Sequence, residues 1–313
     1  MCVTAGTGFV GVRCPSHPIA QQLLRISGVP IAAPSANRFG HVSPTTAQHV
    51  LNDLGGAFIG VLDGDHQGAG SGDFKQSTTC ELGIESTVCK VDSERQRILL
   101  YRRGAVSRRS IEKALEASGH AHFVVEVCQK IIKPSMTDSA GHPKDIFRGN
   151  DGNDQVTAEG HQAPGQLISH YAPDVPTFIL RVTEQGAVEA KSDVQGHANS
   201  KGDTGDTADV MLTKAIVLDF GNRLSWLEGR CLAYSNLSAR GDAREAARVL
   251  FRMLRWAEGM EGQGAAFVVL PDLFSGPEVD DEHLEALADR LFRAASGRVE
   301  EVIRGKLPSL PLV

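Results

Sequence analysis

Apolar side chains recur every three to four residues in three segments of the first third of the chain, which predicts amphipathic helices. The first segment covers residues 16–28, where Ser16 can cap the start of a helix and Gly28 can end it. The second begins at Ser43, with a proline at its first helical position, and ends at two glycines. The third covers residues 107–117 and is closed by a glycine.

Short apolar runs lie between these helical segments and predict β-strands. The runs are residues 9–12, 29–33, 57–62, 85–91 and 98–101. Helices that alternate with short apolar strands are typical of a layered α/β domain.

The second half of the chain repeats this pattern after a change in composition. Residues 120–165 are rich in Gly, Asp, Ser, Gln and His, which favours an insert or linker, and residues 191–209 form a second polar stretch. Strands are predicted at 177–180, 215–218 and 266–270, and helices at about 241–258 and 280–296. We therefore expect a first domain over 1–119, a flexible insert and linker over 120–175, and a second, smaller α/β domain over 176–313.

Composition narrows the function classes. The 313 residues are 41% hydrophobic, which is enough for two domains, and the net charge of −6 argues against a globally basic nucleic-acid binder. Six scattered cysteines without a CxxC pair fit a reducing compartment, and no leader or long apolar run is apparent. We therefore expect a cytoplasmic location and no membrane partner.

The first group of residues with candidate chemistry is Arg13 with the loop Ser35-Ala36-Asn37 and the helix start at Ser43. A guanidinium can grip a carboxylate or phosphate with two donors, and a helix start presents free N–H groups to an anion. An ordinary surface arginine and a plain polar turn are the alternatives for each feature alone. Together the three features favour the binding of an anion beside a small polar ligand.

Other candidates are weaker when taken singly. The triplet Glu85-Ser86-Thr87 is ordinary in a strand, the pair Arg102-Arg103 can be solvated charge or a phosphate contact, and Tyr171 can be a structural anchor or a ring over a bound base. Histidines lack HxH or HExxH spacing, and GxSxG, GxxxxGK[ST] and GxGxxG motifs are absent. The sequence therefore favours neither a zinc enzyme nor a serine hydrolase, and no nucleotide loop of a standard type.

Several ordered motifs together resemble the Sua5/YrdC family of threonylcarbamoyl-AMP synthases. The run Arg13-Cys14-Pro15-Ser16-His17-Pro18 is similar to the family's VRxPxHP stretch, and Ala32 to Asn37 with Gly40 to Thr45 is similar to its APSAN…G…SPT signature. The segments LDG at 62–64, GIESTV at 83–88 and RRGA at 102–105 follow in the family's order. Pro164-Gly165 with His170-Tyr171-Ala172-Pro173 resembles the linker of the longer, two-domain Sua5 type.

The resemblance implies a fold and a reaction. The fold is a twisted mixed-sheet YrdC-like domain followed by a smaller Rossmann-like α/β C-terminal domain. The reaction forms threonylcarbamoyl-AMP and pyrophosphate from L-threonine, bicarbonate and ATP, for the t6A base of tRNA, with a downstream t6A transferase machinery as the next partner. By family likeness Arg13, Ala33 and Ser86 would hold threonine, and Ser35, Asn37, Ser43, Arg102 and Tyr171 would hold ATP. Mg²⁺ is expected with the triphosphate, without a protein ligand assigned to it.

The chain also departs from the family pattern. Residues 1–8 do not correspond to the family's front portion, so we expect an N-terminally truncated YrdC-like domain. The missing portion carries cations that contact phosphates, and its loss would lower or abolish turnover. The alternative function is a non-catalytic YrdC-like protein that binds double-stranded RNA or tRNA through arginines such as Arg25 and Arg38.

Overall fold

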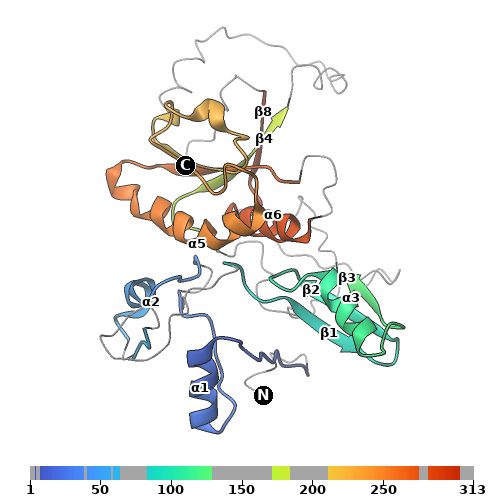
Figure 1. Ribbon diagram of the computed structural model, residues 1–313. Helices are drawn as coiled ribbons and strands as arrows, with labels where there is room; N and C mark the ends of the chain where they lie inside the picture. Colours follow the sequence, from blue (N-terminus) through green and yellow to red (C-terminus); the bar gives the residue numbers. More distant parts are fainter. Residues whose placement is uncertain are drawn as a thin grey trace. The chain divides into compact units, whose positions relative to one another are not determined.

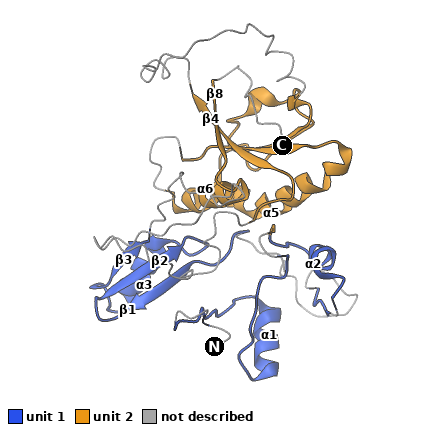
Figure 2. Cartoon of the chain, turned by 180° about the vertical axis from the view of Figure 1, so that it is seen from behind, with its two compact units in different colours: residues 1–39, 43–168 blue, residues 40–42, 169–313 orange. Residues whose placement is uncertain are grey.

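The computed structural model describes residues 4, 8–38, 41–57, 59–63, 83–128, 171–183, 211–274 and 281–303 (Figure 1). The chain forms two compact units, coloured separately in Figure 2. Unit 1 contains residues 1–39 and 43–168, and unit 2 contains residues 40–42 and 169–313. Of the insert and linker predicted at 120–175, residues 129–170 lie outside the described residues, as does all of 191–209.

Unit 1 contains the three predicted amphipathic helices, but the capping residues of the first two differ from the prediction. They are α1 (Pro18–Ser27), α2 (Ala47–Leu54) and α3 (Arg108–Ala117). The prediction that Ser16 caps α1 was wrong, because His17 is the N-cap and makes no side-chain cap bond. Ser43 does not cap α2 either: Thr46 does so, accepting a hydrogen bond from the backbone of His49 at 3.2 Å.

The sheet of unit 1 is mixed, as expected. It consists of β1 (Val88–Asp92), β2 (Arg97–Arg102) and β3 (Val124–Val127), in that order. β1 and β2 pair antiparallel, whereas β2 and β3 pair parallel with α3 between them in the chain. β3 lies inside the range predicted as insert and linker.

The strands predicted at 9–12, 29–33 and 57–62 do not form in the described residues of these ranges. A strand exists only when another strand satisfies its backbone groups, and these segments have no such neighbour in the described structure. Their apolar side chains stay accessible, as at Val12, which is 90% exposed, and Leu62, which is 70% exposed. These segments are apolar, as the pattern indicates, but strand formation also requires a neighbouring strand, and the local pattern does not show whether one is present.

Unit 2 is built on a five-stranded parallel sheet, which confirms the predicted Rossmann-like class. The strands are β4 (Thr177–Thr183), β5 (Ala215–Asp219), β6 (Ala233–Asn236), β7 (Phe267–Pro271) and β8 (Val299–Ile303), ordered β6-β5-β7-β4-β8. Every residue of β5 and β7 is buried, as in central strands of a parallel sheet.

Side chains of alternate residues in these strands pack into two hydrophobic cores, one on each face of the sheet. Ile216 and Leu218 of β5 pack with α5 (Ala243–Gly259) and α6 (Glu282–Ala294), whereas Val217 packs with Leu224 and Leu227 around the short 3₁₀ helix η1 (Ser225–Leu227). A second 3₁₀ turn, η2 (Glu261–Gln263), follows α5. Because successive side chains of a strand point to opposite faces of the sheet, even-numbered residues of β5 pack into one core and odd-numbered residues into the other.

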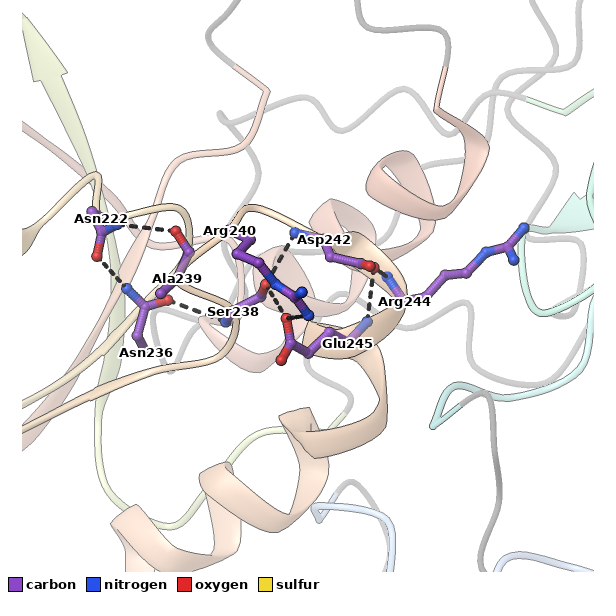
Figure 3. A network of polar contacts seen from close by, with 8 residues as sticks. All are labelled: Asn222, Asn236, Ser238, Ala239, Arg240, Asp242, Arg244 and Glu245. Atoms are coloured by element: carbon purple, nitrogen blue, oxygen red, sulfur yellow. Dashed lines mark hydrogen bonds and ion pairs between the residues drawn. The ribbon is translucent and has the colours of Figure 1, made fainter.

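The start of α5 is fixed by a polar network (Figure 3). Asp242 is the N-cap, and its Oδ1 accepts hydrogen bonds from the backbone N–H groups of Arg244 and Glu245 at 2.8 and 3.0 Å. Ser238 donates its hydroxyl to Glu245 Oε2 at 2.6 Å and accepts from the Asp242 backbone at 3.0 Å. These bonds satisfy backbone donors that a helix start otherwise leaves open, so the first turn of α5 is held firmly.

Within the part of the chain that the structure describes, no helix is long and apolar enough to cross a membrane.

Candidate functional site

Arg102 brings two of the motif segments of unit 1 into direct contact. It ends β2, is 8% exposed, and directs both Nε and Nη2 at the carbonyl oxygen of Ser86, at 3.0 and 2.9 Å. Two donors from one charged group on one acceptor fix the position and direction of that carbonyl. Arg102 and Ser86 were predicted for different substrates, so the contact joins the two predicted subsites.

Gly104 explains why a glycine follows the two arginines. A Cβ built at this position would meet the carbonyl oxygen of Glu85, the backbone nitrogen of Thr87 and the carbonyl carbon of Ser86. All three are backbone atoms, which cannot swing aside as the end of a side chain can. The turn after β2 therefore lies flat against the 85–87 segment only because it carries no side chain here.

Further hydrogen bonds hold the same two segments together. Ala105 donates its backbone N–H to the Glu85 carbonyl at 3.4 Å. The Thr87 hydroxyl donates to the Val106 carbonyl and accepts from the Val106 backbone at 3.1 Å. The 85–87 segment is consequently tied to the strand end at three places, which makes Ser86 a rigidly presented residue.

Ser43 reaches this region from a third segment. Its hydroxyl donates to Glu85 Oε1 at 3.3 Å, across 42 residues of sequence. Ser43, Ser86 and Arg102, three of the eight predicted binding residues, are therefore gathered around Glu85, which sequence reasoning had not singled out beyond its motif. The signal that could have found Glu85 is weak, because one carboxylate in a polar triplet is common.

In the described part of unit 1, three of the other predicted residues, Arg13, Ala33 and Ser35, make no hydrogen bond to this group. Arg13, Ala33 and Ser35 are exposed, and Asn37 donates its side-chain amide to the Arg38 carbonyl at 3.0 Å. Among the described residues, Arg13 makes no hydrogen bond or ion pair. Their assignments to threonine and ATP stay predictions.

Tyr171 lies in unit 2 and is fully buried. Its ring centroid is 5.2 Å from that of Phe251, and the guanidinium carbon of Arg290 lies 5.8 Å from the ring. Its φ of +66° is a left-handed backbone conformation that a bulky residue rarely adopts. The structure thus gives Tyr171 the anchoring role, and a contact with nucleotide stays a prediction.

The charges and thiols of unit 1 limit the chemistry that this group can perform. Burial raises the pKa of the Cys89 and Cys128 thiols, which disfavours the nucleophilic thiolate form. Glu85 offers a single carboxylate, and it already accepts from Ser43. One carboxylate in the described part of this group is fewer protein ligands than a Mg²⁺ site of protein groups needs.

The carboxyl edge of the sheet in unit 2 is the usual ligand position in open α/β folds, and we therefore considered it as a second site. Its polar side chains are used internally. Asp219 accepts from the backbone of Phe220 and Leu224 and from the Tyr234 hydroxyl, and Asp272 pairs with Arg181 Nε at 2.7 Å. These residues stabilise the turns after β5 and β7, and the group around Arg102 is the better candidate.

Comparison with known proteins gives the family. Residues 1–104 match the Sua5/YciO/YrdC family described as "Telomere recombination", and residues 106–296 match the family described as "Threonylcarbamoyl-AMP synthase, C-terminal domain". A threonylcarbamoyl-AMP synthase of Bacillus subtilis is 33% identical over 56% of this chain and 38% of its own length. The synthase of Schizosaccharomyces pombe is 30% identical over 94% of this chain and 59% of its own length. The synthase of Pyrococcus abyssi is 37% identical over 57% of this chain and 39% of its own length.

The solved structures support the fold. The crystal structure of P. abyssi Sua5 complexed with L-threonine has a TM-score of 0.54 and 24% identity, covering 94% of this chain and 66% of that one. A doubly substituted variant of P. abyssi Sua5 gives a TM-score of 0.53 at 22% identity. The chain spans between 38% and 59% of the lengths of the three curated relatives.

Proposed function

Because the chain belongs to the Sua5 family of threonylcarbamoyl-AMP synthases, through matches to both of its domains, we propose that it forms threonylcarbamoyl-AMP. The substrates are L-threonine, bicarbonate and ATP. The amine of threonine takes up bicarbonate as a carbamate with loss of water. A carbamate oxygen then attacks the α-phosphorus of ATP, the bond to the β-phosphate breaks, and pyrophosphate leaves.

The observation that carries this proposal is the contact between Arg102 and the Ser86 carbonyl, with Ser43 on the neighbouring Glu85. Family likeness assigns Ser86 to threonine and both Ser43 and Arg102 to ATP. A reaction between these two substrates requires their binding groups to be adjacent, because the carbamate must approach the α-phosphate in line. The hydrogen bonds that bring Ser43, Ser86 and Arg102 together support the proposal.

The roles of the residues follow from their chemistry. Arg13 would grip the threonine carboxylate, with Ala33 and Ser86 around the amino acid. Ser35, Asn37, Ser43 and Arg102 would contact ATP, and Mg²⁺ bound to the phosphates would neutralise charge on the leaving pyrophosphate. No covalent intermediate with the protein is needed, in keeping with the raised pKa of the Cys89 and Cys128 thiols. The protein's contribution is positioning and electrostatic stabilisation.

The product has a chemical consequence for the next step. A carbamoyl-phosphate anhydride is activated toward amines, so an enzyme that transfers the threonylcarbamoyl group to an adenosine amine should consume it. By family likeness that acceptor is tRNA, and we expect both steps to take place in the cytoplasm. Direct binding of tRNA or double-stranded RNA by this chain stays a prediction.

Pyrophosphate release tests the proposal. The purified chain is incubated with ATP, Mg²⁺, threonine and bicarbonate, and each substrate is omitted in turn. We expect pyrophosphate only when threonine and bicarbonate are both present. Serine in place of threonine controls for unspecific ATP cleavage. Pyrophosphate release that does not respond to threonine, or no release in the complete mixture, would contradict the proposal.

A further inference from the structure

A short piece of the first motif region belongs to unit 2. The residues Gly40 to Val42 cluster with unit 2, although the chain on either side of them belongs to unit 1. Val42 is fully buried in the core that contains Tyr171, Phe251 and Leu254. Burial of a valine side chain stabilises by about 1.5–3 kcal/mol relative to exposure, so this segment is held in place.

Two residues of α5 bind the polar groups of the same segment. Arg255 donates its Nη2 to the Val42 carbonyl, across 213 residues of sequence. His41, 6% exposed, has its Nε2 3.0 Å from Glu258 Oε1 and 3.0 Å from Asp174 Oδ1. Glu258 Oε1 also accepts from the Asp174 backbone at 2.8 Å. We call Arg255, Glu258, Asp174, His41 and Val42 the α5 clamp.

The positions of Arg255 and Glu258 on α5 make this arrangement rigid. They are three residues apart, so both side chains leave the same face of the helix. The other end of α5 is fixed by the Asp242 cap and the Ser238–Glu245 bond shown in Figure 3. The clamp is therefore attached to an element whose first turn cannot easily fray.

We propose that Arg255 and Glu258 are positioning residues for Ser43, one of the predicted ATP contacts. Val42 is joined by one peptide bond to Ser43, whose hydroxyl donates a hydrogen bond to Glu85. Holding the His41 side chain and the Val42 carbonyl restricts the backbone that presents Ser43. The C-terminal domain thereby acts on nucleotide binding through a segment embedded in its own core. This inference rests on the proposed function for its nucleotide part.

The same three side chains, His41, Asp174 and Glu258, could also act as ligands of a divalent metal ion. The hydrogen-bond interpretation is favoured because the single N–H of His41 Nε2 can be shared between the two carboxylate oxygens at 3.0 Å, and Glu258 Oε1 already accepts the Asp174 N–H. A metal would require His41 Nε2 without its hydrogen, whereas the clamp requires Nε2–H as donor. The two arrangements therefore respond differently to a chelator.

Hydrogen–deuterium exchange of the full chain tests the clamp without any reference to activity. The variants are Arg255→Gln and Glu258→Gln, and the matched controls are Arg252→Gln and Glu261→Gln, whose side chains are exposed on or next to α5. We expect peptides over residues 41–46 to exchange about tenfold faster in the first pair only, because local opening frees their amides. Equal protection in all four variants, or loss of protection on adding EDTA to the wild-type chain, would overturn the clamp.

The nucleotide part has a separate readout. We expect Arg255→Gln to raise the KM for ATP about five- to tenfold with kcat within about twofold. This is less than the loss of a charge-assisted hydrogen bond to the substrate itself, because Arg255 acts only through the backbone of Val42 and Ser43. Arg255→Lys, which keeps one donor for the Val42 carbonyl, should recover most of the affinity. A faster-exchanging Arg255→Gln variant with an unchanged KM for ATP would refute the positioning role. If the wild-type chain binds no ATP, the proposed function and the nucleotide part fail together, while the exchange data still decide the clamp.

Discussion

Replacement of Arg102 by lysine isolates the contact on which the proposed site depends. Arg102 directs two N–H donors at the Ser86 carbonyl from a position that is 8% exposed. A lysine ammonium is a point charge on a flexible chain and can supply one of these bonds at most. The substitution keeps the positive charge, so its effect reports on geometry.

The expected magnitude follows from the lost bond. A hydrogen bond from a charged donor contributes about 1.5–3 kcal/mol, and the two bonds of Arg102 are not additive because they share one acceptor. If Ser86 contacts threonine as proposed, loss of one bond corresponds to a drop of about 10- to 150-fold in kcat/KM. We expect most of this drop in kcat/KM for threonine, since Ser86 is the residue displaced.

The assay is pyrophosphate release at saturating ATP with varied threonine. Arg95→Lys is the control, because Arg95 is exposed in the turn that joins β1 and β2. Thermal unfolding of both variants separates loss of the fold from loss of positioning. If Arg102→Lys matches Arg95→Lys in kcat/KM, then Arg102 does not position a substrate-binding segment, and the reasoning about the site is refuted.

Three other substitutions test the packing on which the account is built. Gly104→Ala puts a Cβ against the backbone of residues 85–87, so we expect destabilisation of about 1–3 kcal/mol or more and a loss of turnover. Gly60→Ala is the control, because the space around Gly60 is open, and it should change neither stability nor turnover. Equal unfolding curves for the two variants would contradict the close approach at Gly104. Tyr234→Phe removes the 2.6 Å bond to buried Asp219 and should cost about 1.5–3 kcal/mol at neutral pH. Burial, followed by Asp219, raises the pKa of Tyr234, so its stabilising effect is full below its unfolded pKa of about 10 and shrinks above it; a difference between wild type and variant that stays constant to pH 11 would oppose this. Asp242→Ala removes the cap of α5 and should lower the unfolding temperature at pH 7. Because the backbone N–H of Glu245 lowers the pKa of Asp242, the difference should be full above the unfolded pKa of about 4 and shrink as the pH falls further. A difference that is the same at pH 2 as at pH 7 would count against it.

Elements with local signals could be predicted from the sequence. The helix α3 begins after its Ser107 cap and ends before Gly119, as expected, because caps and stripes act within a few residues. The central strands β5 and β7 were found because strands buried on both faces are continuous apolar runs. The edge strand β6 was missed, since its sequence Ala-Tyr-Ser-Asn is half-buried and polar, and β8 was missed for the same reason.

Features that depend on distant segments could not be predicted. The runs at 9–12 and 29–33 carry strand-like sequences, but their pairing depends on neighbours outside the local pattern. The contact of Ser43 with Glu85 and that of Arg255 with Val42 each join residues far apart in the chain. The motif order, read as a family resemblance, supplied Ser86 and Arg102 as members of one site, whereas no local rule places a residue of α5 beside His41.

Incorporation of labelled bicarbonate into an adenylate tests the central claim most directly. The chain is incubated with ATP, Mg²⁺, threonine and ¹³C-bicarbonate, and the nucleotides are separated and weighed by mass spectrometry. The account predicts a threonine-dependent adenylate that gains one mass unit from the label, with one pyrophosphate released for each molecule formed. An adenylate without the label, or ATP that is cleaved equally with and without threonine, would contradict it.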